Sequence, residues 1–71
     1  MTGRRSYRVT VAGHVGPAVA ESFAPLVVTS AHGETTISGE QLDAAMLGGV
    51  LRTIERLGLE LVAITSQVDG G

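Results

Sequence analysis

Apolar residues alternate with polar ones, or recur at helical spacing, in six successive segments of this chain. In residues 7–14, Tyr7, Val9 and Val11 alternate with polar or small residues, which is the period of a half-buried strand. Residues 16–25 suit a short helix, because one proline falls in its first turn and a second proline ends it. The first third of the chain therefore predicts a strand followed by a helix.

Two segments rich in β-branched residues, 26–31 and 34–39, flank a His-Gly dipeptide at 32–33. Histidine tolerates a positive φ better than most residues and glycine tolerates it freely, so this dipeptide can form a two-residue primed turn. In that register Val28 lies opposite Ile37 on one face of the hairpin. The pattern predicts a β-hairpin.

A second helix is predicted over 40–57. Ser38 and Gln41 have the spacing of a capping box at its start, and Gly58 suits a left-handed stop at its end. Apolar and small residues at spacings of three and four predict its inward face. They are Leu42, Ala45, Met46, Gly49, Val50, Thr53 and Leu57.

Residues 59–66 predict a last strand in which Glu60 points outward and Leu59, Leu61 and Ala63 point inward. The order strand, helix, strand, strand, helix, strand is the ferredoxin-like pattern, an α+β sandwich. Right-handed crossovers place the first and third strands at the centre of a four-stranded antiparallel sheet, with both helices on one face. We expect one domain over 1–71 with frayed ends at 1–5 and 67–71.

The sheet face without helices is predicted to be unusually apolar for a surface in contact with water. The chain is 44% hydrophobic and only 17% charged, against about 25% charged in typical domains, and it has no cysteine for a disulfide. So small a domain gains much from association. We therefore expect a homodimer or higher oligomer, packed sheet to sheet or edge to edge. The predicted interface is Thr10, Ala12, Val27, Thr29, Thr36, Val62 and Ile64.

A second contact surface, for another protein, is predicted on the long helix. Leu47 and Leu51 lie to the side of the inward stripe, and Gly48 lies on the outer side, where it would allow close approach of another backbone. The exposed edge strand at 27–31 is the alternative binding surface. The alternative, which the sequence favours equally, is that Gly48 has no role in binding and is merely tolerated in the helix.

Charge and hydropathy exclude several classes of partner. The net charge is −2 without a basic stripe, so nucleic acid is not expected as a partner. No apolar run approaches the roughly 20 residues that span a bilayer, and no secretory signal is visible, so we expect no membrane association and a cytoplasmic location. No cluster has metal-ligand spacing, and no metal or cofactor is expected.

His14, His32 and Glu34 are the candidate ligand-binding residues. The ends of the first two strands lie at the same end of the predicted sheet, about 10 Å apart at two strand spacings, and Glu34 starts the strand between them. A histidine beside a carboxylate can serve acid–base chemistry near neutral pH. The alternative for His32 is a purely conformational role in the turn.

Residues 35–65, TTISGEQLDAAMLGGVLRTIERLGLELVAIT, resemble a group of short, functionally uncharacterised actinobacterial proteins of ferredoxin-like outline. The matching positions are Leu47, Gly49, Leu51, Ile54, Leu57, Gly58, Leu59 and Leu61. The phrase GVLRTIERLGLELVAI at 49–64 is also similar to a run in ACT regulatory domains, and that resemblance implies small-molecule sensing.

Three hypotheses for function follow. The first is a small non-catalytic interaction module that self-associates and serves as an accessory or regulatory subunit of another protein. The second is an ACT-like domain that binds small molecules at subunit interfaces near His14. The third is a small dimeric enzyme that uses His14 or His32, although no serine or cysteine nucleophile has a recognisable setting.

Overall fold

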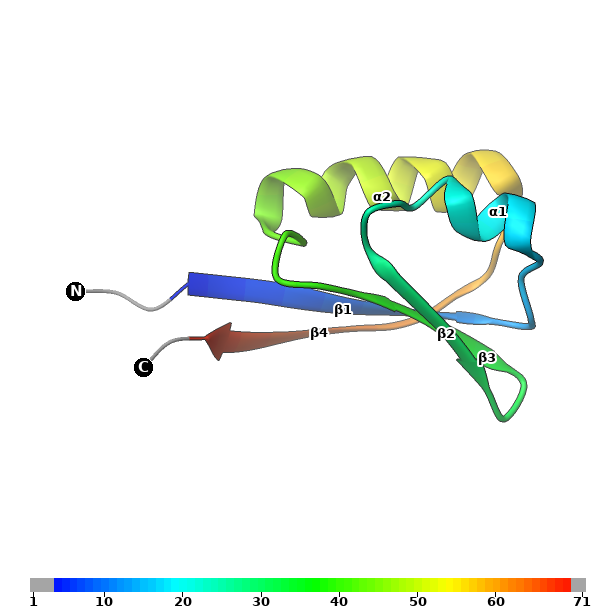
Figure 1. Ribbon diagram of the computed structural model, residues 1–71, viewed down its shortest axis with the longest axis horizontal. Coiled ribbons are helices and arrows are strands. Elements are labelled where there is room, and N and C mark those ends of the chain that lie inside the picture. The colour runs from blue at the N-terminus through cyan, green and yellow to red at the C-terminus, as the bar shows by residue number, and fades with distance from the viewer. Residues whose placement is uncertain (1–3, 70–71) are drawn as a thin grey trace.

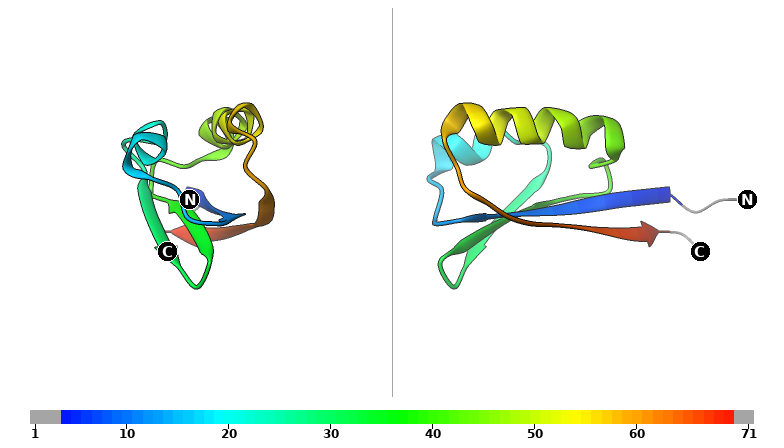
Figure 2. Two further views of the ribbon diagram at one scale, coloured as in Figure 1. Left: turned by 90° about the vertical axis from the view of Figure 1, so that its right-hand side faces the viewer. Right: turned by 180° about the vertical axis from the view of Figure 1, so that it is seen from behind.

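The structure is a computed structural model that describes residues 4–69. Its elements are β1 (Arg4–Ala12), α1 (Pro17–Glu21), β2 (Val27–Ala31), β3 (Glu34–Ser38), α2 (Ala44–Leu57) and β4 (Leu61–Asp69). The strands form one sheet in the order β2-β3-β1-β4, and every neighbouring pair is antiparallel. Both helices lie on the same side of this sheet (Figure 1, Figure 2). The predicted ferredoxin-like α+β fold is confirmed.

The β2–β3 hairpin has the predicted turn and register. His32 and Gly33 have φ values of 54° and 77°, so both adopt the left-handed conformation of a primed turn. Val28 lies opposite Ile37, as the two-residue turn requires. In Figure 1 the hairpin is strongly twisted relative to β1 and β4, and its turn lies on the side away from the helices.

β1 and β4 are longer than the sequence pattern indicated. They pair from Val11 opposite Leu61 out to Arg4 opposite Asp69 and form a ribbon that extends beyond α2 (Figure 1). Residues 4–5 and 67–69, which were expected to be frayed, therefore lie in strands. The rest of the two expected frayed ends lies outside the described residues.

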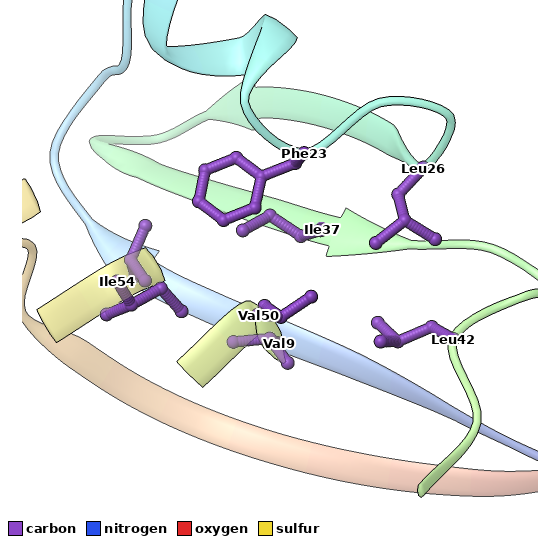
Figure 3. Close-up of a cluster of buried hydrophobic side chains, with 8 residues drawn as sticks. Val9, Phe23, Leu26, Ile37, Leu42, Val50 and Ile54 are labelled. Carbon is purple, nitrogen blue, oxygen red and sulfur yellow. The ribbon is translucent and has the colours of Figure 1, made fainter. Parts of the chain in front are cut away.

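A single apolar cluster holds the helices to the sheet (Figure 3). It draws on β1, β3 and α2, on the connection from α1 to β2, and on the loop before α2. Its buried members are Val9, Val11, Phe23, Leu26, Ile37, Leu42, Val50 and Ile54. This one-sided core leaves the opposite face of the sheet without a covering layer.

α1 is shorter than predicted and ends at Glu21 rather than near Pro25. Beyond it the backbone tightens to bonds between residues three apart, including the Phe23 amide to the Ala20 carbonyl at 3.0 Å. Phe23 therefore reaches the core from the connection and not from the inner face of the helix. The prediction of a helix over 16–25 was wrong at its C-terminal end.

α2 begins four residues later than predicted, and its N-cap is Asp43 rather than Ser38. The Asp43 carboxylate accepts a hydrogen bond of 2.9 Å from the Met46 amide. Leu42 lies before the helix, where it is fully buried and its carbonyl accepts a bond of 2.8 Å from the Tyr7 amide. Gly58 ends the helix at φ 73°, as predicted.

The inward face of α2 is rotated relative to the prediction. Val50 and Ile54 are buried, and Leu47 and Leu51 pack against the core. Leu47 and Leu51, which were predicted to lie to the side of the inward stripe, therefore belong to the core-facing side of the helix, and their contact with another protein stays a prediction. Gly48 does lie exposed on the outer side.

No close contact within the subunit explains why α2 has glycine at positions 48 and 49. A Cβ atom built on Gly48 or Gly49 meets nothing within 4 Å. Gly49 was predicted on the inward face of this helix, but it is exposed.

A register shift in β4 overturns the predicted orientation of its second half. Val11 lies opposite Leu61, but the next residue of β1, Thr10, lies opposite Ala63. Val62 is therefore the extra residue of a β-bulge, and alternation beyond it is displaced by one. Ile64 lies opposite Val9, on the helix side of the sheet. Its predicted place on the open face was wrong.

Candidate functional site

The open face of the sheet is built from three rows of residues that lie opposite one another across the strands. One row is Thr65, Arg8, Ser38 and Val27, and the next is Ala63, Thr10, Thr36 and Thr29. The third row contains Ala12, Glu34 and Ala31. The Ala12 amide donates a hydrogen bond of 2.9 Å to the Glu60 carbonyl. Of the predicted interface, Thr10, Ala12, Val27, Thr29 and Thr36 lie on this face. Small hydroxyl side chains dominate it, so it is less apolar than predicted.

A hollow of about 410 Å³ lies on this face at the β2–β3 side. It is lined by Arg8, Thr29, Ala31, His32, Glu34, Thr36 and Ser38. It thus combines one guanidinium, one carboxylate, one imidazole and three hydroxyls. We call it the open-face hollow.

The structure brings together two of the three predicted ligand-binding residues. His32 and Glu34 line the open-face hollow, whereas His14 does not. β1 ends at Ala12, and Gly13 adopts φ 91° while its amide donates to the Gly33 carbonyl at 2.7 Å. His14 consequently lies in an exposed loop after β1 and not within the strand that was predicted over 7–14.

Arg8 is the residue of the hollow that sequence reasoning missed as a site residue. The alternation of β1 puts it on the same face as Thr10, and that parity is the signal that could have found it. Its partner on β3, Ser38, also lines the hollow.

No group of three or more histidine, cysteine or acidic residues within 4–69 is arranged to hold a metal ion. The titratable side chains of the hollow are a single acid, a single base and a single histidine. This set suits recognition of a ligand by charge and hydrogen bonds better than it suits metal chemistry.

The outer edge of β4 is a second candidate surface. β4 is an edge strand, and residues 61–68 contain neither a charge nor a proline. Four large apolar side chains at this side of the molecule are 37–47% exposed: Leu57, Leu61, Val62 and Ile64. We call these four residues the β4 seam. Neutral edges with exposed apolar residues readily pair with another strand.

A groove of about 580 Å³ lies between the α1–β2 connection and the first half of α2. Phe23, Leu26 and Val50 contribute core atoms to its lining, and Met46 and Gly49 line it on the helix side. Its polar lining residues include Gln41 and Asp43, and Asp43 is already engaged as the cap of α2.

No helix within residues 4–69 combines the length and apolar character required to cross a bilayer.

Comparison with known proteins assigns the chain to a family. No curated protein and no solved structure matches it. A family profile does match, over residues 6–65, which runs from β1 to the middle of β4 and takes in both candidate surfaces. The chain therefore belongs to the family described as "Domain of unknown function (DUF8691)".

Proposed function

We propose that this protein is a small non-catalytic interaction module that forms a homodimer through the outer edges of β4. The observation that carries the proposal is the combination of an uncharged edge strand with the exposed apolar side chains of the β4 seam. In this role the dimer serves as an accessory or regulatory subunit of another protein. The resemblance of residues 35–65 to actinobacterial proteins favours such an organism as the source, and the location we propose is cytoplasmic.

The β4 edge lacks the charges that proteins place on strands to prevent association. Native edge strands commonly carry lysine, inward-pointing charges or proline. The run Leu61–Val68 of β4 has none of these, and its flanking acids, Glu60 and Asp69, lie outside it. Its one irregularity is the register shift at Val62. Backbone donors and acceptors along this edge are therefore available to a further strand.

Pairing of β4 with a second β4 by a two-fold axis is antiparallel and extends the sheet from four strands to eight. The helices of both copies then lie on the same side of the extended sheet. Ile64 lies on that helix side, opposite Val9, and Leu61 lies opposite Val11. These side chains of one copy would meet those of the other beside the two α2 helices.

The edge is favoured over the open face as the interface for two reasons. Ile64 lies on the helix side, so the open face loses the most apolar residue of the predicted sheet-to-sheet contact. Full burial of a leucine, isoleucine or valine side chain contributes about 1.5–3 kcal/mol, and the seam residues retain more than a third of their exposure. Eight such side chains in a dimer supply several kcal/mol in addition to the backbone hydrogen bonds.

The test compares the same substitution at the two edges of the sheet. Val62→Lys introduces a charge into the β4 seam, and Val27→Lys introduces it at β2, where the side chain is 58% exposed. The mass in solution is measured by light scattering and sedimentation. We expect about twice the chain mass of 7.3 kDa for the parent protein and for Val27→Lys, and the chain mass for Val62→Lys.

Two outcomes contradict the proposal. One is a parent protein that stays at 7.3 kDa at high concentration. The other is a dimer that dissociates with Val27→Lys and persists with Val62→Lys, which would assign the interface to the β2 edge. Circular dichroism of each variant establishes that it is folded before its mass is interpreted.

A further inference from the structure

We infer that the open-face hollow binds an extended dipolar ligand, a molecule with an anionic group at one end and a cationic group at the other, such as a short peptide with free termini. The inference concerns the opposite part of the sheet from the β4 seam and does not depend on dimerisation. It replaces the predicted site at His14, His32 and Glu34 with one at Arg8, His32 and Glu34.

The two charges of the hollow lie at its opposite ends. Arg8 lies opposite Ser38, and Glu34 lies opposite Ala12, four residues further along β1. At about 3.3 Å per residue, their backbones are separated by roughly 13 Å along the sheet. Arg8 and Glu34 form no ion pair with each other or with any other described residue.

The three hydroxyls of the hollow are also uncommitted. Thr29, Thr36 and Ser38 make no side-chain hydrogen bond to another residue in 4–69. Thr36 lies opposite Thr29, so two hydroxyls are adjacent at the middle of the hollow. By contrast, Ser30 and Thr35 on the same strands bond to each other at 2.8 Å. The hollow thus gathers the polar side chains that the fold itself does not use.

The shape of the hollow follows from small side chains between large ones. Thr29 and Thr36 occupy the middle row, while arginine and the His32–Glu34 pair stand at the ends. The primed turn fixes His32 next to Glu34, because both turn residues adopt left-handed conformations. A volume of about 410 Å³ is within the range of roughly 300–1,000 Å³ typical of small-molecule sites.

This arrangement favours a ligand of both signs over a simple anion or cation. A simple anion would pair with Arg8 and a simple cation with Glu34, but at a separation of roughly 13 Å either one leaves the charge at the other end without a partner. A molecule whose opposite charges are separated by two or three peptide units satisfies both ends. Its peptide groups can then bond to the hydroxyls of Thr29 and Thr36, as peptide groups bond to polar side chains elsewhere.

Triglycine is the probe, because it has both charges and no side chains. Its binding to the full ¹⁵N-labelled chain is followed by NMR, together with N-acetyl-triglycine, which lacks the cation, and triglycinamide, which lacks the anion. We expect triglycine to shift the amides of β1, β3 and the 32–33 turn. Each blocked peptide should bind about tenfold more weakly, the effect of losing one charged hydrogen bond.

Charge-removing variants assign each end of the ligand. Arg8→Gln should weaken the binding of triglycine about tenfold and leave the binding of triglycinamide unchanged. Glu34→Gln should also weaken the binding of triglycine about tenfold, and it should leave the binding of N-acetyl-triglycine unchanged. Arg52→Gln and Glu55→Gln make the same changes on exposed positions of α2 and should have no effect.

The inference is overturned if triglycine produces no shifts at millimolar concentrations, or if its shifts fall on residues outside the hollow. It is equally overturned if Arg8→Gln and Glu34→Gln bind triglycine as the parent does. Val62→Lys should bind triglycine unchanged, so loss of the dimer and loss of the site are separate results.

Discussion

The hydroxyl of Thr35 donates a hydrogen bond of 2.7 Å to the carbonyl of Gly13. Thr35 is fully buried on β3, and Gly13 follows the last residue of β1. The same hydroxyl bonds to Ser30 on β2 at 2.8 Å. One buried side chain therefore links three segments next to the hairpin turn, and this end of the sheet depends on it.

Thr35→Val keeps the shape of the side chain and removes both bonds. The Gly13 carbonyl then loses its partner, so we expect the free energy of unfolding to fall by about 1–3 kcal/mol in urea denaturation. Ser30→Ala is the control, because Ser30 is exposed and water can replace its bond. It should change stability by less than about 0.5 kcal/mol. Equal effects of the two substitutions would contradict the assignment.

Asp43→Ala tests the start of α2. Loss of the carboxylate that accepts from the Met46 amide should destabilise the protein by about 1 kcal/mol, while Asp43→Asn should retain most of the stability. Ser38→Ala and Gln41→Ala test the alternative capping box and should be near neutral. If Ser38→Ala lowers the free energy of unfolding more than Asp43→Ala does, the capping box at Ser38 and Gln41 is the true start of the helix.

Gly48→Ala and Gly49→Ala should each stabilise the protein by about 1 kcal/mol. Both residues lie in the helix interior, and an added Cβ meets nothing within 4 Å. In thermal unfolding, this raises Tm by about 4–8 °C for a domain of this size. Gly58→Ala is the opposite case, because φ there is 73°, and it should destabilise by about 1–2 kcal/mol. A destabilising Gly49→Ala would mean that another chain approaches this helix closely.

His32→Val should destabilise the protein by about 1–2 kcal/mol, because a β-branched residue resists the left-handed conformation that His32 adopts at φ 54°. His32→Asn should preserve stability, since asparagine tolerates that conformation. His14→Val is the matched control at an exposed loop position and should stay within about 0.5 kcal/mol. Chemical denaturation of the three variants checks this prediction, and equal losses at both histidines would contradict it.

The hairpin was predictable because one local feature determines it. A two-residue turn at 32–33 leaves a single register, and that register puts Val28 opposite Ile37. The order of elements likewise gave the positions of all four strands, because the connections allow few alternatives.

The orientation of Ile64 was not predictable from alternation. A β-bulge adds one residue to a strand without a marker in the sequence, and Val62 is as suitable for a regular strand as for a bulge. A single extra residue exchanged the faces of every residue beyond it. The predicted apolar open face failed for this reason.

The start of α2 was ambiguous for a different reason. Ser38 and Asp43 can both act as N-caps, and choosing the earlier one rotated the expected inward face. Leu47 and Leu51 were then assigned to the surface although they pack on the core. The candidate site was mispredicted in a similar way, because His14 was assigned to a strand that ends two residues before it.

The pairing of residue 4 with residue 69 brings both ends of the described backbone to one tip of the ribbon, about 4.8 Å apart, whereas the 32–33 turn lies at the far tip (Figure 1). Any polypeptide fused at either end emerges at that one tip and leaves the other unobstructed. A circular permutant, with the old ends joined by a short linker and new ends opened between His32 and Gly33, would preserve every β1–β4 pair.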